Sequence, residues 1–85
     1  MGCTGLTTFT IPYNVKKLGY RCFAGCTNLT TLIFENTGSV WYRTINSDYT
    51  KSIYVGAMFE ESMRELALED LSNGEYYYYI KDNKL

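Results

Sequence analysis

The sequence predicts an α+β protein in which a short solenoid of parallel strands is followed by a C-terminal cap with one helix and short strands. Three observations lead to this fold class. Residues 2–11 recur as residues 25–34, at a fixed offset of 23 residues. Residues 59–71 have apolar side chains at helical spacing, and the tyrosine-rich residues 75–80 have the composition of a strand. The length of 85 residues corresponds to one small domain.

The two copies of the repeat carry the same residue types in the same order. Each begins Gly-Cys-Thr and continues with the pattern Leu-x-x-apolar-x-apolar, which ends at Ile11 in the first copy and at Phe34 in the second. A fixed period in the twenties with this pattern is typical of leucine-rich-repeat solenoids, in which stacked coils bury a common apolar stripe. We therefore expect about one and a half coils in residues 1–36 and the cap in residues 37–85.

Alternation along the repeated strands assigns their side chains to two faces. Phe9 and Ile11 are expected to point inward in the first copy, and Leu32 and Phe34 in the second. The outward positions are Thr8, Thr10, Thr31 and Ile33. Because the copies share one register, their strands are expected to pair in parallel. Ile33 breaks the threonine pattern, so it is expected either to contact a ligand or to pack under the cap.

Residues 11–26 add a more specific pattern, Ile-Pro-x-x-Val-x-x-Leu-Gly-x-x-x-Phe-x-x-Cys. The chain resembles the BspA-like leucine-rich repeats of bacterial surface proteins, whose consensus runs Leu-x-x-Ile-x-Ile-Pro-x-x-Val-x-x-Ile-Gly-x-x-Ala-Phe-x-x-Cys. The matching residues are Leu6, Phe9, Ile11, Pro12, Val15, Leu18, Gly19, Phe23 and Cys26, while Cys22 replaces the usual alanine. More loosely, the tail with Trp41 and a final tyrosine-rich strand is similar to the way such proteins end.

This resemblance implies a non-enzymatic protein-binding or adhesion module at the C-terminal end of a bacterial cell-surface or secreted protein. The partner would be a protein or a glycan on another cell or on a host surface. The candidate binding residues are outward strand positions and two cap tyrosines: Thr8, Thr10, Thr31, Ile33, Tyr77 and Tyr79. Two alternatives stay open, namely a purely structural solenoid cap and a stand-alone interaction protein, such as an intracellular or viral binder or inhibitor.

Local patterns predict the remaining short elements. Pro12 should end the first strand, because proline has no amide hydrogen to donate. Gly19 should mark a tight turn before a short helical turn at residues 20–24. Residues 40–44 and 52–55 are expected to form two further short strands.

The expected helix spans residues 59–71 and is amphipathic. Its apolar face contains Phe59, Met63, Leu66, Ala67 and Leu71, and its solvated face contains Glu60, Glu61, Arg64, Glu65, Glu69 and Asp70. Asn73 and Gly74 should end the helix. In the following strand, residues 75–80, alternation places Tyr76, Tyr78 and Ile80 on one side and Tyr77 and Tyr79 on the other. One side of this strand is expected to be buried, unless the tyrosines stack on a sugar or on a protein.

Composition and charge argue against several classes of function. A net charge of −1 with both signs scattered argues against nucleic acid as a partner. No stretch is apolar over the roughly 18 residues that a membrane span needs, and the chain shows no secretory signal pattern. Without histidine there is no Ser-His-Asp or Cys-His set, and no phosphate-binding loop is present. We therefore expect no enzyme activity and no cofactor.

The cysteines and the first strand leave alternatives open. Cys3 and Cys26 hold the same repeat position, where a strand spacing of about 4.8 Å would permit a disulfide, although two buried thiols are the preferred expectation. Three cysteines without histidine make an incomplete zinc site, so no metal is expected. The strand at residues 6–11 should have a free edge. Either further coils precede it in a longer protein, or a second copy covers it in a homodimer.

Overall fold

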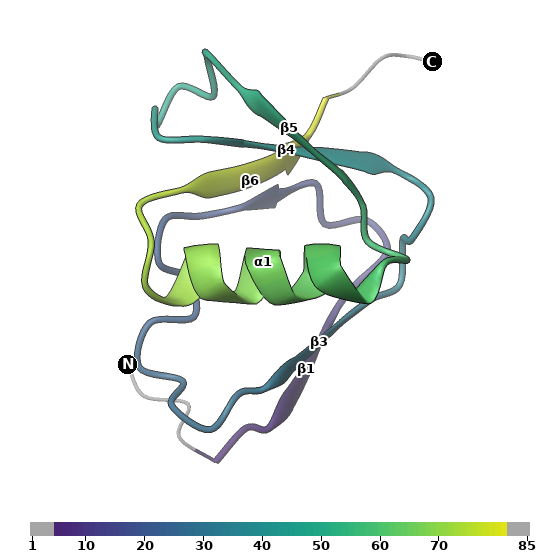
Figure 1. Cartoon of the computed structure of the whole chain (residues 1–85), viewed down its shortest axis with the longest axis vertical. Coiled ribbons are helices and arrows are strands. Elements are labelled where there is room, and N and C mark those ends of the chain that lie inside the picture. Colours follow the sequence, from purple (N-terminus) through teal and green to yellow (C-terminus); the bar gives the residue numbers. More distant parts are fainter. Residues whose placement is uncertain (1–4, 82–85) are drawn as a thin grey trace.

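The computed structural model of the chain describes residues 5–81, with residues 1–4 and 82–85 outside the described part. Its elements in chain order are β1 (Thr8–Ile11), β2 (Lys17–Leu18), β3 (Thr31–Phe34), β4 (Val40–Thr44), β5 (Ile53–Ala57), α1 (Glu61–Ser72) and β6 (Tyr77–Ile80). They form a two-stranded sheet, β1-β3, and a four-stranded sheet in the order β2-β6-β4-β5. Figure 1 shows α1 across the middle of the molecule, with the four-stranded sheet on one side and the β1–β3 pair on the other.

Strands β1 and β3 are the equivalent strands of the two repeat copies. They pair in parallel, with Thr8 opposite Thr31 and Ile11 opposite Phe34, so the register keeps the 23-residue offset of the sequence. The pairs within the four-stranded sheet are antiparallel. A parallel solenoid is therefore not confirmed beyond this one pair, because after residue 36 the repeat pattern gives way to turn residues and to strands that pair antiparallel.

Strand β2 was not predicted, and it connects the repeat segment to the following part of the chain. Lys17 lies opposite Tyr79 and Leu18 lies opposite Tyr78 in an antiparallel pair with β6. The amide of Ile80 also donates a hydrogen bond to the carbonyl of Lys16, at 2.9 Å. The segments expected as repeats and as cap therefore share one sheet.

Residues 20–24 form successive turns and not the helical turn expected from the sequence. The amide of Cys22 donates to the carbonyl of Gly19, and the amide of Ala24 donates to that of Arg21. Arg21 has a positive φ of 53°. This left-handed conformation explains the difference, because a right-handed helix cannot continue through it.

The hydrophobic core lies where α1 and the two sheets meet. Its buried residues are Ile11, Leu18, Phe23, Cys26, Leu29, Leu32, Phe34, Trp41, Val55, Met58, Ala67, Leu71 and Tyr78. The ring of Phe34 in β3 packs edge-on against that of Trp41 in β4, with 5.5 Å between the ring centroids. This contact joins the repeat segment to the rest of the chain in one core.

Phe9 does not occupy the buried position that the repeat pattern predicted. It is 36% exposed, whereas Leu32, directly opposite in β3, is 2% exposed. α1 packs against β3, while the ring of Phe9 has an aromatic contact only with Phe23 among residues 5–81, at a centroid distance of 5.6 Å. The prediction was wrong because a repeat position is buried only when neighbouring elements cover it on both sides.

The helix follows its predicted pattern except at two positions. Met63, Leu66, Ala67 and Leu71 lie in or against the core, as expected. Phe59 is exposed, because the extended backbone of Glu60 (φ −89°, ψ 131°) leaves Phe59 outside the helix. Asp70, expected on the solvated face, is buried. Its burial follows from polar contacts with β4 and β6 that the helical pattern cannot reveal.

The predicted strands of the second half are present with shifted ends. β4 has the predicted bounds, whereas β6 begins two residues late, at Tyr77. β5 runs on to Ala57 through Gly56, which has a φ of +136°. A Cβ atom at Gly56 would lie 3.4 Å from the sulfur of Met63. Glycine therefore lets the strand adopt this backbone and pass close to α1.

Equivalent repeat positions should differ in their contribution to stability. Leu32→Ala should lower the free energy of unfolding by about 2–5 kcal/mol, because it opens a cavity beneath α1. Phe9→Ala should cost only about 1 kcal/mol, because that ring is already partly in water. Urea denaturation of both variants measures the difference. Equal losses would show that the two coils are covered alike.

Candidate binding surfaces

Thr8, Thr10, Thr31 and Ile33 form an exposed patch on the outer side of the β1–β3 pair, which we call the threonine face. Thr8 lies opposite Thr31, and Thr10 lies opposite Ile33. All four side chains are exposed, as the alternation of the strands predicted. The structure therefore brings four of the six candidate binding residues together in two adjacent rows.

Ile33 is 45% exposed and does not pack under the following segment. It lies beside a hollow of about 260 Å³ lined by Thr31, Leu32, Ile33, Phe34, Thr37, Met58 and Arg64. Four consecutive residues of β3 line the hollow, and consecutive strand residues point to opposite faces. The hollow therefore lies along an edge of β3, and this is the edge that does not pair with β1. Arg64 donates a hydrogen bond to the carbonyl of Met58, at 2.8 Å, which fixes the segment before α1 at this edge. The exposure of Ile33 argues against the packed role, and its role as a contact stays a prediction.

A second surface covers the side of the four-stranded sheet that is turned away from α1. Arg43 and Tyr78 reach toward α1, so their strand neighbours Tyr42, Tyr77 and Tyr79 point to the opposite side. Six tyrosines form a continuous series of ring contacts on that side, which we call the tyrosine face: Tyr20, Tyr77, Tyr49, Tyr79, Tyr42 and Tyr54, with centroid distances of 5.8, 5.5, 5.1, 6.2 and 5.7 Å between successive rings.

Three cations lie over rings of the tyrosine face. The Nζ atom of Lys17 is 4.7 Å from the ring centroid of Tyr49, and that of Lys81 is 4.5 Å from the centroid of Tyr42. The guanidinium of Arg21 lies 5.7 Å from the ring of Tyr20. Within residues 5–81, Arg43 and Asp70 make the only ion pair. The three cations of this face therefore have π-system contacts but no carboxylate partner in the described part of the chain.

The candidate residue Tyr79 is not accessible as the sequence interpretation required. It is 7% exposed, because the rings of Tyr42 and Tyr49 pack against it and its hydroxyl forms a hydrogen bond with that of Ser52. Tyr77 is half-buried between Tyr20 and Tyr49. The expectation that one side of β6 is buried is confirmed by Tyr78, but the other side is also largely covered.

The accessible residues of the tyrosine face were missed by the sequence interpretation. They are Tyr20 and Tyr54 at its two ends, Tyr42 between them, and the cations Lys17, Arg21 and Lys81. They were missed because their contacts join residues that are far apart in the chain, and because the sequence interpretation did not predict β2, which carries Lys17. The available signal was the count of nine tyrosines, combined with the alternation of Tyr42 and Arg43 in β4.

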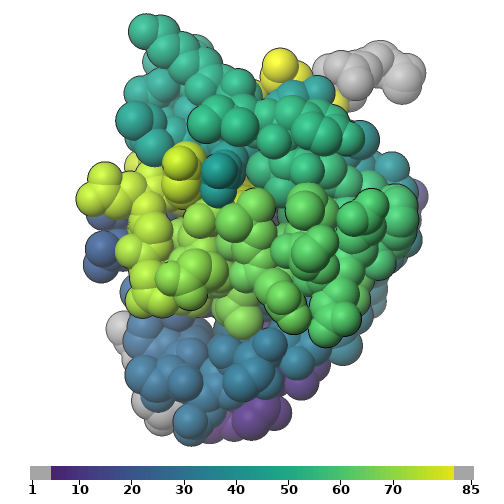
Figure 2. All heavy atoms as spheres, viewed as in Figure 1, coloured from purple at the N-terminus to yellow at the C-terminus, as the bar shows by residue number. Residues whose placement is uncertain are grey.

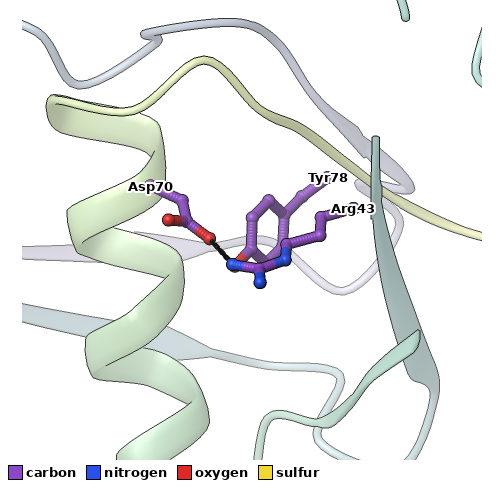
Figure 3. Close-up of polar contacts among 3 residues, drawn as sticks. All are labelled: Arg43, Asp70 and Tyr78. Atoms are coloured by element: carbon purple, nitrogen blue, oxygen red, sulfur yellow. Dashed lines mark hydrogen bonds and ion pairs between the residues drawn. The ribbon is translucent and has the colours of Figure 1, made fainter. Parts of the chain in front are cut away.

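A polar cluster between α1 and the sheet fixes the orientation of β4 and β6. Figure 3 shows the carboxylate of Asp70, which projects from α1, meeting the guanidinium of Arg43 beside the ring of Tyr78. The Oδ2 atom of Asp70 accepts hydrogen bonds from Nη1 of Arg43, at 2.7 Å, and from the hydroxyl of Tyr78, at 2.6 Å. The guanidinium also lies 4.4 Å from the ring centroid of Tyr76. The cluster thereby directs the alternate residues of both strands toward the tyrosine face.

Burial raises the pKa of Tyr78 far above its ordinary value, and the hydrogen bond to the Asp70 carboxylate and its negative charge raise the pKa further. The hydroxyl therefore stays protonated and continues to donate to Asp70 at any physiological pH. Tyr78 and Asp70 are buried and Arg43 is partly buried, and the geometry of the cluster is that of a structural link between helix and sheet.

The cysteines differ from the preferred expectation. Cys26 is disulfide-bonded, Cys22 is a free thiol, and Cys3 lies outside the described residues. The expectation of an unbridged thiol is therefore wrong for Cys26. Equivalent repeat positions recur about 4.8 Å apart, within reach of a disulfide. Partial desolvation raises the pKa of the Cys22 thiol, which disfavours the reactive thiolate.

One further hollow, of about 330 Å³, lies between α1 and the turns before β3. It is lined by Phe23, Gly25, Cys26, Thr27, Leu29, Leu68, Glu69, Ser72 and Asn73. Figure 2 shows this side, where the blue atoms of the turns meet the green atoms of α1. Glu69 is the one charged residue of the lining, so the hollow offers no pair of groups for acid–base chemistry. Among residues 5–81, no three metal-ligating side chains gather at one place.

Asp70 should contribute strongly to stability, in contrast to its exposed neighbour Glu69. Asp70→Ala removes the acceptor of one buried donor, Tyr78, and of one partly buried donor, Arg43, and should lower the free energy of unfolding by about 2–4 kcal/mol. Glu69→Ala should change it by less than about 0.5 kcal/mol. Thermal and urea denaturation of both variants would test this, and a mild effect of Asp70→Ala would contradict the proposed link.

The raised pKa of Tyr78 predicts a loss of stability at alkaline pH. Above pH ~10 the tyrosine ionises in the unfolded chain but keeps its proton in the folded chain, so unfolding is increasingly favoured as the pH rises. Tyr78→Phe cannot show this contribution. The stability advantage of the wild type over Tyr78→Phe should therefore shrink above pH ~10, as measured by urea denaturation at a series of pH values. A constant difference between pH 8 and 11 would be inconsistent with the buried hydroxyl.

Comparison with known proteins gives one match. No curated protein and no solved structure matches the chain, and no helix among residues 5–81 is long and apolar enough to cross a membrane. The family described as "BspA type Leucine rich repeat region (6 copies)" matches residues 1–53. The match covers both repeat copies and β4, which is more than half of the sequence. The chain therefore belongs to the BspA-type leucine-rich-repeat family.

Proposed function

We propose that the chain is a non-enzymatic adhesion module of a bacterial cell-surface or secreted protein, and that it binds through the threonine face. The observation that carries this proposal is the coincidence of the family match, residues 1–53, with an exposed patch at equivalent positions of two paired repeat strands. Leucine-rich repeats are protein–protein interaction modules whose stacked coils present extended surfaces. The partner is a protein or a glycan on another cell or on a host surface.

The chemistry of the threonine face suits recognition. Threonine hydroxyls can donate and accept hydrogen bonds, and β-branched side chains have little rotational freedom to lose on binding. Ile33 adds an apolar contact in the same patch. A stable interface buries about 800 Å² on each partner, which is more than four side chains supply. The threonine face is therefore part of a larger surface, extended by further coils or by a second copy paired along the open edge of β1.

A purely structural role as a solenoid cap is the second candidate. It is favoured by the way α1 and Trp41 cover the apolar side of β3, where Leu32 and Phe34 are buried. A solenoid needs such a cover at its last coil. In that case the threonine face would contribute nothing to binding. The adhesion role and the cap role therefore differ in whether substitutions on the threonine face weaken binding.

The adhesion role predicts that the native protein is exposed on its source cells. An antibody against this chain would be applied to whole lysate and to intact cells before and after protease treatment. The expected result is a band much larger than the 9.8 kDa of the chain, which disappears on protease treatment of intact cells. A band of the chain's own mass that survives the treatment would refute the surface role and support a small internal binder.

The threonine face itself is tested with matched surface variants. Fluorescently labelled wild type and Thr10→Lys/Thr31→Lys would be compared for binding to cultured cells and to immobilised extracellular-matrix proteins. The double variant should bind at least tenfold more weakly, about 1.4 kcal/mol. Ser47→Lys/Ser62→Lys adds the same charge at exposed positions elsewhere and should bind as the wild type does. Equal binding by all three proteins would favour the structural cap.

A further inference from the structure

Exposed acidic residues gather around α1, whereas cations gather on the tyrosine face, where Asp48 and Glu75 are the neighbouring exposed acids. The exposed acidic residues around α1 are Glu60, Glu61, Glu65 and Glu69. The tyrosine face instead carries the cations Lys17, Arg21 and Lys81. Asp48, in the loop beside this face, accepts hydrogen bonds from the amide and hydroxyl of Thr50. The three cations outnumber the two neighbouring acids, Asp48 and Glu75, so an acidic ligand would be attracted to the tyrosine face and repelled from α1.

The cations of the tyrosine face are held in place before any ligand binds. Lys17 and Lys81 lie within 5 Å of ring centroids, and neither has a carboxylate partner among residues 5–81. A cation that is already ordered on a ring loses less conformational entropy when it pairs with an incoming carboxylate. Tyrosine rings add large contact area at low entropic cost, and tyrosine and arginine are enriched at protein interfaces.

The edge of the sheet beside this face is exposed at the start of β5, whereas Val55 and Gly56 further along the strand are buried. β5 is the last strand in the order β2-β6-β4-β5, and within residues 5–81 it pairs only with β4. Its residues Ile53 and Tyr54 are 50% and 64% exposed. An edge strand presents unpaired N–H and C=O groups that can bond to an added strand. Only a polypeptide can supply that backbone, which distinguishes this ligand from a glycan or a nucleic acid.

The two sides of β5 fix the chemistry of an added strand. Tyr54 contacts Tyr42 on the tyrosine face, close to Lys81, whereas Ile53 lies opposite Arg43 and points to the other side. Side chains of an added strand would alternate in the same way. We propose that an extended segment of a partner protein, with carboxylates on one side and apolar residues on the other, adds to the edge of β5 and lays its carboxylates on the tyrosine face.

This interaction uses a surface separate from the threonine face, so it does not depend on the adhesion role. Lys81 follows β6, but its Nζ atom lies over the ring of Tyr42 in β4, so it is the cation of the tyrosine face nearest to the added strand and would attract its carboxylates. Lys17 lies on β2, at the far edge of the sheet, four strand spacings or about 19 Å from the added strand. That distance exceeds the screening length of about 8 Å at physiological salt. Lys17 would thus contribute only long-range attraction that salt removes.

The test uses a fluorescein-labelled ten-residue peptide of alternating glutamate and valine and measures binding to the whole chain by fluorescence anisotropy. Lys81→Glu should weaken binding at least tenfold, and Tyr54→Ser should weaken it less. Lys17→Glu should have an effect in low salt that disappears at high salt. Lys16→Glu is the matched control, because Lys16 lies outside the series of ring and cation contacts, and it should remain near the wild type. Circular dichroism confirms that each variant is folded.

Variants of the peptide test strand addition without changing the protein. In an added strand, every second N–H group points toward β5 and the others point away from it. Two forms of the peptide are therefore needed, one methylated at the odd-numbered backbone nitrogens and the other at the even-numbered ones. Only one of the two forms blocks the hydrogen bonds to β5. One form should lose binding and the other should keep it. Equal binding of both forms, or equal binding of an alternating lysine–valine peptide, would overturn the proposal. Tighter binding of a heparin oligosaccharide or of an oligothymidylate would overturn it as well, because the face would then serve a different class of macromolecule.

Discussion

The apolar side of β3 has to be covered, and most of the structure follows from the way this is done. A single repeat coil cannot bury its own apolar stripe. Here α1 and Trp41 cover Leu32 and Phe34, so the helix lies across the coil and not beside it. Phe9 shows what happens without such cover, because the equivalent position in β1 remains partly in water.

Once α1 is in place, it becomes the support for the four-stranded sheet. Asp70 binds Arg43 of β4 and Tyr78 of β6 through one carboxylate oxygen, which sets the side of each strand that faces the helix. The opposite side of this sheet has no second helix over it in the described part of the chain. Tyrosines pack on one another there instead, since their rings exclude water while their hydroxyls tolerate it. The tyrosine face is thus a consequence of a sheet with only one covering layer.

The sequence predicted the features that depend on local pattern. The register of β1 and β3, the bounds of β4 and the apolar face of α1 all follow from periodicity within one segment. The exceptions depend on contacts between distant segments. β2 is only two residues long and exists because β6 pairs with it. Asp70 looks solvated in a helical pattern, and only its partners on β4 and β6 explain its burial. The threonine face was predicted for the same local reason, whereas the tyrosine face depends on contacts between distant segments, which the count of tyrosines alone does not specify.

The loop between β4 and β5 shows that the tyrosine face is held in a defined arrangement. Tyr49 and Lys51 have positive φ angles of 61° and 55°, conformations that cost about 1–3 kcal/mol each for residues other than glycine. Hydrogen bonds from Thr44 and Asn46 to the carbonyl of Thr50 hold the loop in this form. Its result is that the ring of Tyr49 lies between Tyr77 and Tyr79, under the cation of Lys17. The strained loop therefore sets the position of the Tyr49 ring, and through it the arrangement of the tyrosine face.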